Sequence, residues 1–110
     1  MQRPLDITFR DMTPSPAVEA AIERWAARLE HQYARIQHCA VIVEQPHHHH
    51  RQGNHVHVHV DLTVPGREIA SRGAEHENAY VAIAEAFRAT RRQLQDHARI
   101  QRGDVKRHVA

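Results

Sequence analysis

The segment HVHVHVDLTV, residues 55–64, alternates strictly between polar and apolar side chains. A period of two residues is typical of a β-strand whose two faces meet different surroundings. The valines and the leucine are expected in a core, and the opposite face presents a row of histidines, His55, His57 and His59. The pattern therefore predicts a sheet with one buried face and one open face.

Three further segments are predicted to be strands of the same sheet. Residues 4–11 alternate in the same way, and Cys39–Glu44 is a run rich in β-branched residues. The turn signal Pro65-Gly66 is followed by a short predicted strand from Arg67 to about Gly73. Residues 45–54, which contain four consecutive histidines, are expected to form a loop between two strands.

Two amphipathic helices are predicted from apolar residues that recur at spacings of three and four. The first runs from about Pro16 to about Ile36, with Ser15 as its N-cap. The second starts near Asn78 or Ala79 and ends at Gly103. Their expected buried faces are Val18, Ile22, Trp25, Leu29, Tyr33 and Ile36 in the first, and Tyr80, Ile83, Phe87, Leu94 and Ala98 in the second.

The predicted elements follow the order β-α-β-β-β-α, which is typical of the α+β class. The first two strands are expected to be parallel because a helix connects them, and the others can pair as antiparallel neighbours. We expect a four-stranded mixed sheet with two helices packed on one face. Residues 1–103 would form a single domain, and residues 104–110 a loose basic tail.

The length of 110 residues and the apolar fraction of 41% suit one globular domain. No apolar segment is long enough to cross a membrane, and the N-terminus lacks the pattern of a signal peptide. A single cysteine, Cys39, rules out a disulfide within the chain and is interpreted as a buried structural residue. We therefore expect a cytoplasmic protein that does not bind membranes.

Positive charge is concentrated in the C-terminal part of the chain. Residues 88–110 carry seven basic and two acidic side chains, whereas residues 1–87 carry eight basic and eleven acidic ones. Helical spacing places the arginines in two stripes, Arg24, Arg28 and Arg35 on the first helix and Arg88, Arg91, Arg92, Arg99 and Arg102 on the second. Such stripes suit the backbone of a nucleic acid, and solvation of the helices is the alternative.

The chain shows no motif of a known catalytic site, so an enzyme with a small-molecule substrate is not expected. The rival interpretation rests on the 12 histidines of the chain. His55, His57 and His59 lie on one face of a strand and could act as ligands to zinc. A histidine-rich metal-binding protein therefore remains an alternative, although we expect no cofactor beyond adventitious or weak zinc.

Taken together, these segments resemble the ribosome hibernation-promoting factors, also called ribosome-associated inhibitors or sigma-54 modulation proteins, in their short form. The resemblance covers almost the whole chain and rests on residues 5–10, 15–19, 29–30, 58–69, 79–83, 89–94 and 101–106. The sequence departs from well-known short members at Ala84, Asp96 and Ala98.

The resemblance implies a translation inhibitor that acts in stress, by binding rRNA of the small ribosomal subunit where mRNA and tRNA normally sit. It assigns the contact to the basic helices, and so to Arg88, Arg91, Arg92 and Arg99, with weaker parts for Arg24, Arg28 and Arg35. It also implies a protein that is monomeric off the ribosome and, without a C-terminal extension, does not pair ribosomes unaided. A general module for structured RNA is the other alternative.

Overall fold

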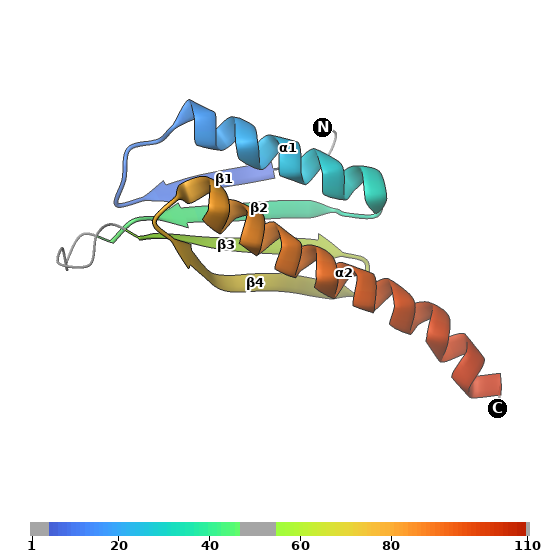
Figure 1. Ribbon diagram of the computed structural model, residues 1–110. Coiled ribbons are helices and arrows are strands. Elements are labelled where there is room, and N and C mark those ends of the chain that lie inside the picture. Colours follow the sequence, from blue (N-terminus) through green and yellow to red (C-terminus); the bar gives the residue numbers. More distant parts are fainter. Residues whose placement is uncertain (1–4, 47–54, 110) are drawn as a thin grey trace.

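The computed structural model describes residues 5–46 and 55–109, and their side chains apart from those of residues 72, 73 and 101–109. The described elements follow the predicted order (Figure 1). The strands are β1 (Leu5–Arg10), β2 (His38–Glu44), β3 (Val56–Val64) and β4 (Arg67–His76), and the helices are α1 (Pro16–Gln32) and α2 (Ala79–Val109).

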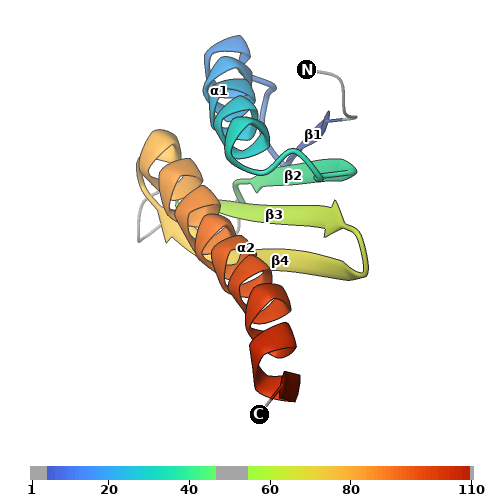
Figure 2. The ribbon, with the colours of Figure 1, turned by 90° about the vertical axis from the view of Figure 1, so that its right-hand side faces the viewer.

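The four strands form one mixed sheet in the order β1-β2-β3-β4. β1 and β2 are parallel, whereas β2 pairs with β3 and β3 with β4 in antiparallel fashion. Figure 2 shows both helices on the same side of this sheet, so that its other side is left open. The predicted α+β class, with two helices on one face of a four-stranded mixed sheet, is confirmed.

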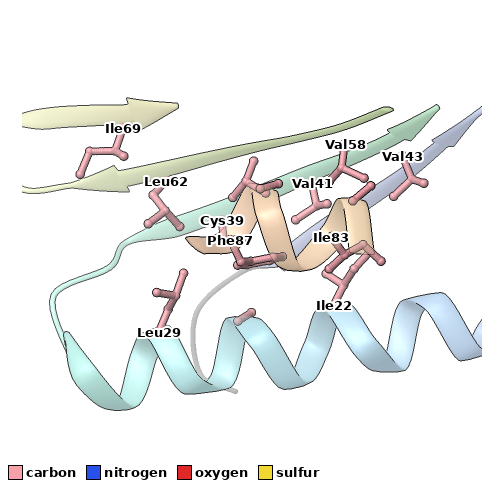
Figure 3. Packing of buried hydrophobic residues seen from close by; sticks show 14 of the residues in the cluster. Ile22, Leu29, Cys39, Val41, Val43, Val58, Leu62, Ile69, Ile83 and Phe87 are labelled. Atoms are coloured by element: carbon pink, nitrogen blue, oxygen red, sulfur yellow. The ribbon is translucent and has the colours of Figure 1, made fainter. Parts of the chain in front are cut away.

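The core lies between the sheet and the helices and is built from the alternating strand residues. Every valine of β3 and Leu62 is buried, whereas His57 and His59 on the other face are only partly covered. Side chains from both helices close this core, with Ile22 and Leu29 from α1 and Phe87 from α2 (Figure 3). The alternation of β3 therefore directs one face of the sheet to the core, as its sequence predicts.

Cys39 belongs to this core, where its side chain is buried and its thiol is free. Burial raises the pKa of the thiol from 9.0 to about 12, and the nearby charge of Asp61 adds to the shift. The interpretation of Cys39 as a buried structural cysteine is therefore confirmed.

We expect Cys39 to resist thiol reagents in the native protein, because only the thiolate reacts. A pKa of about 12 in place of 9.0 lowers the thiolate fraction at pH 8 roughly a thousandfold. The folded state holds this proton more tightly than the unfolded state does. The contribution of the Cys39 thiol to the free energy of unfolding should therefore be fully present below pH 9 and should be lost as the pH rises from 9 towards 12. Ellman's reagent with and without urea measures the first effect, and fast labelling without urea would contradict it.

α1 begins where the sequence predicts but ends earlier. Its N-cap Ser15 accepts a hydrogen bond from the backbone N–H of Val18 at 3.2 Å, and Pro16 occupies the first helical position. The helix ends at Gln32, four residues before the predicted end at Ile36. The prediction was wrong because Ile36 lies in the connection between α1 and β2. Its side chain is buried there, at a position that fits the spacing of the helix although its backbone is not helical.

α2 begins after Asn78, whose side-chain oxygen accepts hydrogen bonds from the N–H groups of Tyr80 at 2.8 Å and Val81 at 3.4 Å. Its far end differs from the prediction, because the helix continues past Gly103 to Val109 and projects beyond the sheet (Figure 1). A glycine inside a helix costs only about 1 kcal/mol, which is too little to end a helix alone. Residues 104–109 are therefore helical in this structure and not a loose tail.

Two smaller predictions about this half of the chain were also wrong. Tyr80 was expected in the core but is 47% exposed, because the buried stripe of α2 is centred on other residues, which include Thr90 and His97. β4 was expected to end near Gly73, but it continues to His76. A register shift opposite Val58–Val60 falls at residues 72 and 73, and β4 remains paired beyond it. The glycine at position 73 is a common sign of such an irregularity.

Candidate nucleic-acid interface

Exposed arginines gather on the helices, on the side of the domain away from the open face of the sheet. We call this group the arginine face. It comprises Arg24 and Arg28 on α1 and Arg88, Arg91, Arg92 and Arg99 on α2, of which only Arg91 is half-buried. The α2 members follow one stripe of the helix because they recur at spacings of three, four and seven. Such a row of fixed positive charges suits a polyanion.

The two helices meet on this face at Trp25, which is half-buried. The guanidinium carbon of Arg28, one turn further along α1, lies 4.8 Å from the centre of the indole ring. The guanidinium carbon of Arg88, from α2, lies 5.8 Å from the same centre. Both distances are in the range of cation–π contacts, so arginines of the two helices converge on one aromatic ring.

Phe87 holds Trp25 from the core side. Their ring centres are 5.8 Å apart and their planes differ by 14°, which is an offset stack. Phe87 is completely buried, whereas its neighbour Arg88 is exposed. The core thus fixes the indole, and the indole lies at the base of the arginine pair. The sequence pattern placed Trp25 only on the apolar face of α1 and gave no sign of this role.

Arg99 lies further along the arginine face and is engaged by a carboxylate. Its guanidinium forms an ion pair with Asp96, three residues earlier on α2. The Arg99 side chain is 72% exposed and that of Asp96 49%, so water screens the pair. Asp96 nevertheless competes with any external anion for this arginine.

Replacing Asp96 with asparagine is expected to tighten binding to a polyanion about two- to fivefold, because it releases Arg99 and removes one repelling charge. Equilibrium binding to RNA at constant salt would measure this change. Glu68→Gln is the matched control, since it removes the same charge from an exposed position on the open face of the sheet. Equal effects of the two variants would show that only net charge matters and would contradict a local role for Asp96.

Two of the predicted arginines are placed differently or lie beyond the described side chains. Arg35 is exposed, but it lies in the turn after α1 and not on the helical stripe. The backbone of Arg102 belongs to α2, and its side chain is outside the described part. The predicted stripe on α1 is therefore reduced to Arg24 and Arg28, with His31 in the last turn.

The open face of the sheet has the opposite charge. Its described residues include one arginine, Arg10, and five carboxylates, those of Asp6, Glu44, Asp61, Glu68 and Glu75. Two of these carboxylates contact histidines, because Asp6 pairs with His38 across β1 and β2 at 2.8 Å and Glu75 pairs with residues of the histidine row. At neutral pH this face would repel phosphates, whereas the arginine face attracts them.

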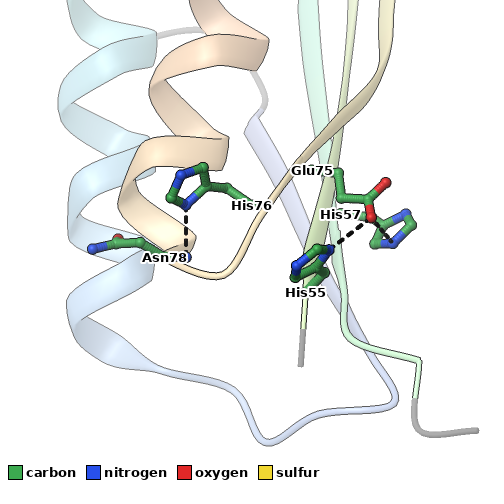
Figure 4. Close-up of polar contacts among 5 residues, drawn as sticks. All are labelled: His55, His57, Glu75, His76 and Asn78. Atoms are coloured by element: carbon green, nitrogen blue, oxygen red, sulfur yellow. Dashed lines mark hydrogen bonds and ion pairs between the residues drawn. The ribbon is translucent and has the colours of Figure 1, made fainter. Parts of the chain in front are cut away.

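Glu75 connects two members of the histidine row across β3 and β4 (Figure 4). Its carboxylate oxygen lies 2.8 Å from Nδ1 of His55 and 3.8 Å from Nε2 of His57. The hydrogen bond with His55 lowers the pKa of Glu75, and the charge of His57 lowers it further. These contacts pair the histidines with a carboxylate, which is a simple reason for their presence on this face.

The alternative interpretation was a metal site, but no set of metal ligands is assembled in the part of the chain that the structure describes. There, no three side chains of histidine, cysteine, aspartate or glutamate are arranged to hold a metal ion. His59 makes no part of the Glu75 contacts. The four-histidine segment, on which the loop prediction partly rests, falls in residues 47–54 and lies outside the described residues.

Comparison with known proteins identifies the family of the chain. A family model described as "Sigma 54 modulation protein / S30EA ribosomal protein" matches residues 5–102, which is nearly the whole sequence. The chain belongs to this family. The resemblance noted in the sequence is therefore confirmed, and the match covers both helices that carry the arginine face.

Two solved structures show that this S30EA-family chain shares its fold with other proteins. A ribosomal subunit interface protein from Coxiella burnetii is similar with a TM-score of 0.70 and 18% identity, over 86% of this chain and 97% of that one. The N-terminal domain of Thermus thermophilus Protein Y is similar with a TM-score of 0.64 and 20% identity, over 84% and 94% of the two chains. No curated protein sequence matches the S30EA-family chain. Neither described helix has both the length and the apolar character needed to cross a membrane.

Proposed function

We propose that this S30EA-family protein is a translation inhibitor that binds rRNA of the small ribosomal subunit through the arginine face. Membership of a family named for ribosomal proteins supports a ribosomal partner. The observation that carries the proposal is the arginine face itself, which joins exposed arginines of α1 and α2 into one surface. Arginine suits this task because its planar guanidinium binds phosphate through two N–H groups at once.

The opposite charges of the two sides support one orientation of the domain on RNA. The arginine face would meet the phosphates, and the carboxylates of the open face would point away from them. The reverse orientation would bring Asp61 and Glu68 towards a dense array of negative charge, which costs free energy at every contact. The helices therefore form the docking side, and the sheet supports them.

The proposed mechanism is occupancy and involves no chemical reaction. Electrostatic attraction brings the domain to the subunit, and the bound domain then excludes mRNA and tRNA from the channel in which they sit. Such a protein needs no cofactor and acts in the cytoplasm, where the ribosomes are. The position in that channel is suggested by the resemblance in the sequence and makes the mechanism specific enough to test.

A competition assay tests the proposed function. Purified small subunits are loaded with a short mRNA and labelled initiator tRNA, and the protein is added at increasing concentration. We expect loss of bound tRNA with a stoichiometry of one protein per subunit, and inhibition of translation in an extract over the same concentration range. Tight binding to the subunit without release of tRNA would contradict the proposed location.

A comparison of binding affinities distinguishes a ribosome factor from a general RNA-binding module. A duplex RNA of about 20 base pairs offers the same phosphates without the shape of the subunit. We expect affinity for small subunits to exceed that for the duplex by at least about tenfold at moderate salt, because only the subunit matches the whole face. Equal affinities would favour the general module.

A further inference from the structure

The arginines of the arginine face do not have equal surroundings. Arg28 and Arg88 come from different helices and lie over one indole, that of Trp25. Arg99, by contrast, is already paired with Asp96. Both guanidinium carbons of the first pair are within 6 Å of one ring centre. One aromatic ring thus contacts two positive charges that come from different helices.

We propose that Trp25, Arg28 and Arg88 form a preorganised site for RNA backbone phosphate, in which Trp25 is the positioning residue. This inference rests on the proposed function and adds to it a principal contact point at the junction of α1 and α2. The indole does not itself bind RNA in this proposal. It holds the two guanidiniums where their N–H groups can reach one phosphate or two neighbouring phosphates.

The physical basis is conformational entropy. A free arginine side chain has many rotamers and loses most of this freedom when it is fixed in a contact. An arginine that already lies over a ring has lost part of this freedom before RNA arrives, so its contact is less costly. A guanidinium that lies flat on a ring also keeps the N–H groups at its edge free to donate. The indole therefore orders both arginines without using their donors.

The core makes Trp25 a rigid support. One side of the indole stacks on Phe87, which is completely buried, and the ring is half-buried among the apolar side chains of both helices. A ring held in this way has a fixed position relative to the core, and so have the arginines that contact it. By comparison, an arginine such as Arg92, which is exposed on the same helix, has no aromatic contact in the described structure and serves as a reference.

The test is a double-mutant cycle on binding to purified small ribosomal subunits. Trp25→Leu keeps an apolar side chain of the core and removes the ring, whereas Trp25→Phe keeps a weaker ring. Arg28→Gln with Arg88→Gln removes the two cations. We expect Trp25→Leu to weaken binding about 3- to 10-fold, Trp25→Phe to restore most of this loss, and Trp25→Leu to have no effect once both arginines are glutamine.

The salt dependence supplies a readout that a purely structural role would not change in this way. Loss of both arginines should reduce the slope of log affinity against log salt by about 0.7 to 0.9 for each phosphate contact removed. Trp25→Leu should leave the slope unchanged, because both arginines can still reach the phosphates. Arg92→Gln is the matched control, and its loss of affinity should not depend on residue 25.

Several outcomes would overturn the inference. If Trp25→Leu weakens binding equally with and without the arginines, the indole contacts RNA directly or supports the fold, and the positioning role is wrong. If Trp25→Leu binds like the wild type while the arginine variant does not, the proposed function stands and the inference fails. If the wild-type protein does not bind subunits at all, both fail. Circular dichroism of each variant verifies that only folded protein is compared.

Discussion

Reversal of charge at Arg88, Arg91 and Arg92 is expected to weaken binding to small ribosomal subunits at least about 100-fold at physiological salt. Each arginine changed to glutamate loses a favourable phosphate contact and adds a repulsive charge at the same place. The three residues lie within little more than one turn of α2, so the variant converts the middle of the arginine face into an acidic patch. Filter binding or sedimentation with labelled protein would measure the loss.

The control reverses charge on the other side of the domain. Arg10 is exposed on the open face of the sheet, and its change to glutamate alters the charge there without touching the helices. This control should retain most of the binding. Because Arg91 is half-buried, a milder variant with Arg88→Gln and Arg92→Gln keeps the experiment interpretable if the triple variant is unstable. Unchanged binding in the triple variant would show that the arginine face is not the contact surface.

Truncation of Phe87 to alanine is expected to lower the free energy of unfolding by about 3–5 kcal/mol. The side chain is completely buried between α2, the sheet and Trp25, so its removal leaves a cavity and ends the aromatic stack. A domain of this size has a total stability of only about 5–15 kcal/mol, so the variant is expected to be close to unfolding at 37 °C. Urea unfolding followed by circular dichroism measures the change.

Two further variants separate packing from other effects of Phe87. Phe87→Leu keeps most of the volume and should cost much less, whereas Gln95→Ala on the exposed side of α2 should stay within about 0.5 kcal/mol of the wild type. The single tryptophan of the chain reports on the same site, because the stack on Phe87 determines the surroundings of Trp25. A loss below about 1 kcal/mol for Phe87→Ala would contradict the packing described here.

The sequence was sufficient to predict the arrangement of elements but not all of their ends. Strict alternation in residues 55–64 marks a strand with one buried face because the period of a strand is unambiguous. Helix ends depend on contacts that the period does not record. Ile36 matches the spacing of α1 although it is buried from the following connection, and Gly103 does not interrupt α2. In both cases tertiary or neighbouring structure overrides a local signal.

For the candidate site, the sequence predicted which arginines share a face but not how the helices combine. Spacing along one helix places Arg88, Arg91, Arg92 and Arg99 in a row. That Arg28 and Arg88 both contact Trp25 depends on the packing of α1 against α2, which no local pattern encodes. The ion pair of Arg99 is different, since its spacing of three residues from Asp96 was visible in the sequence and could have been predicted.

Sedimentation with purified small ribosomal subunits through sucrose gradients, at low and at moderate salt, tests the central claim most directly. The claim is that the arginine face binds ribosomal RNA. It predicts one protein per subunit in the subunit peak at low salt, with binding retained at moderate salt and lost progressively as salt rises further. Folded wild-type protein that stays at the top of the gradient at both salt concentrations would contradict it.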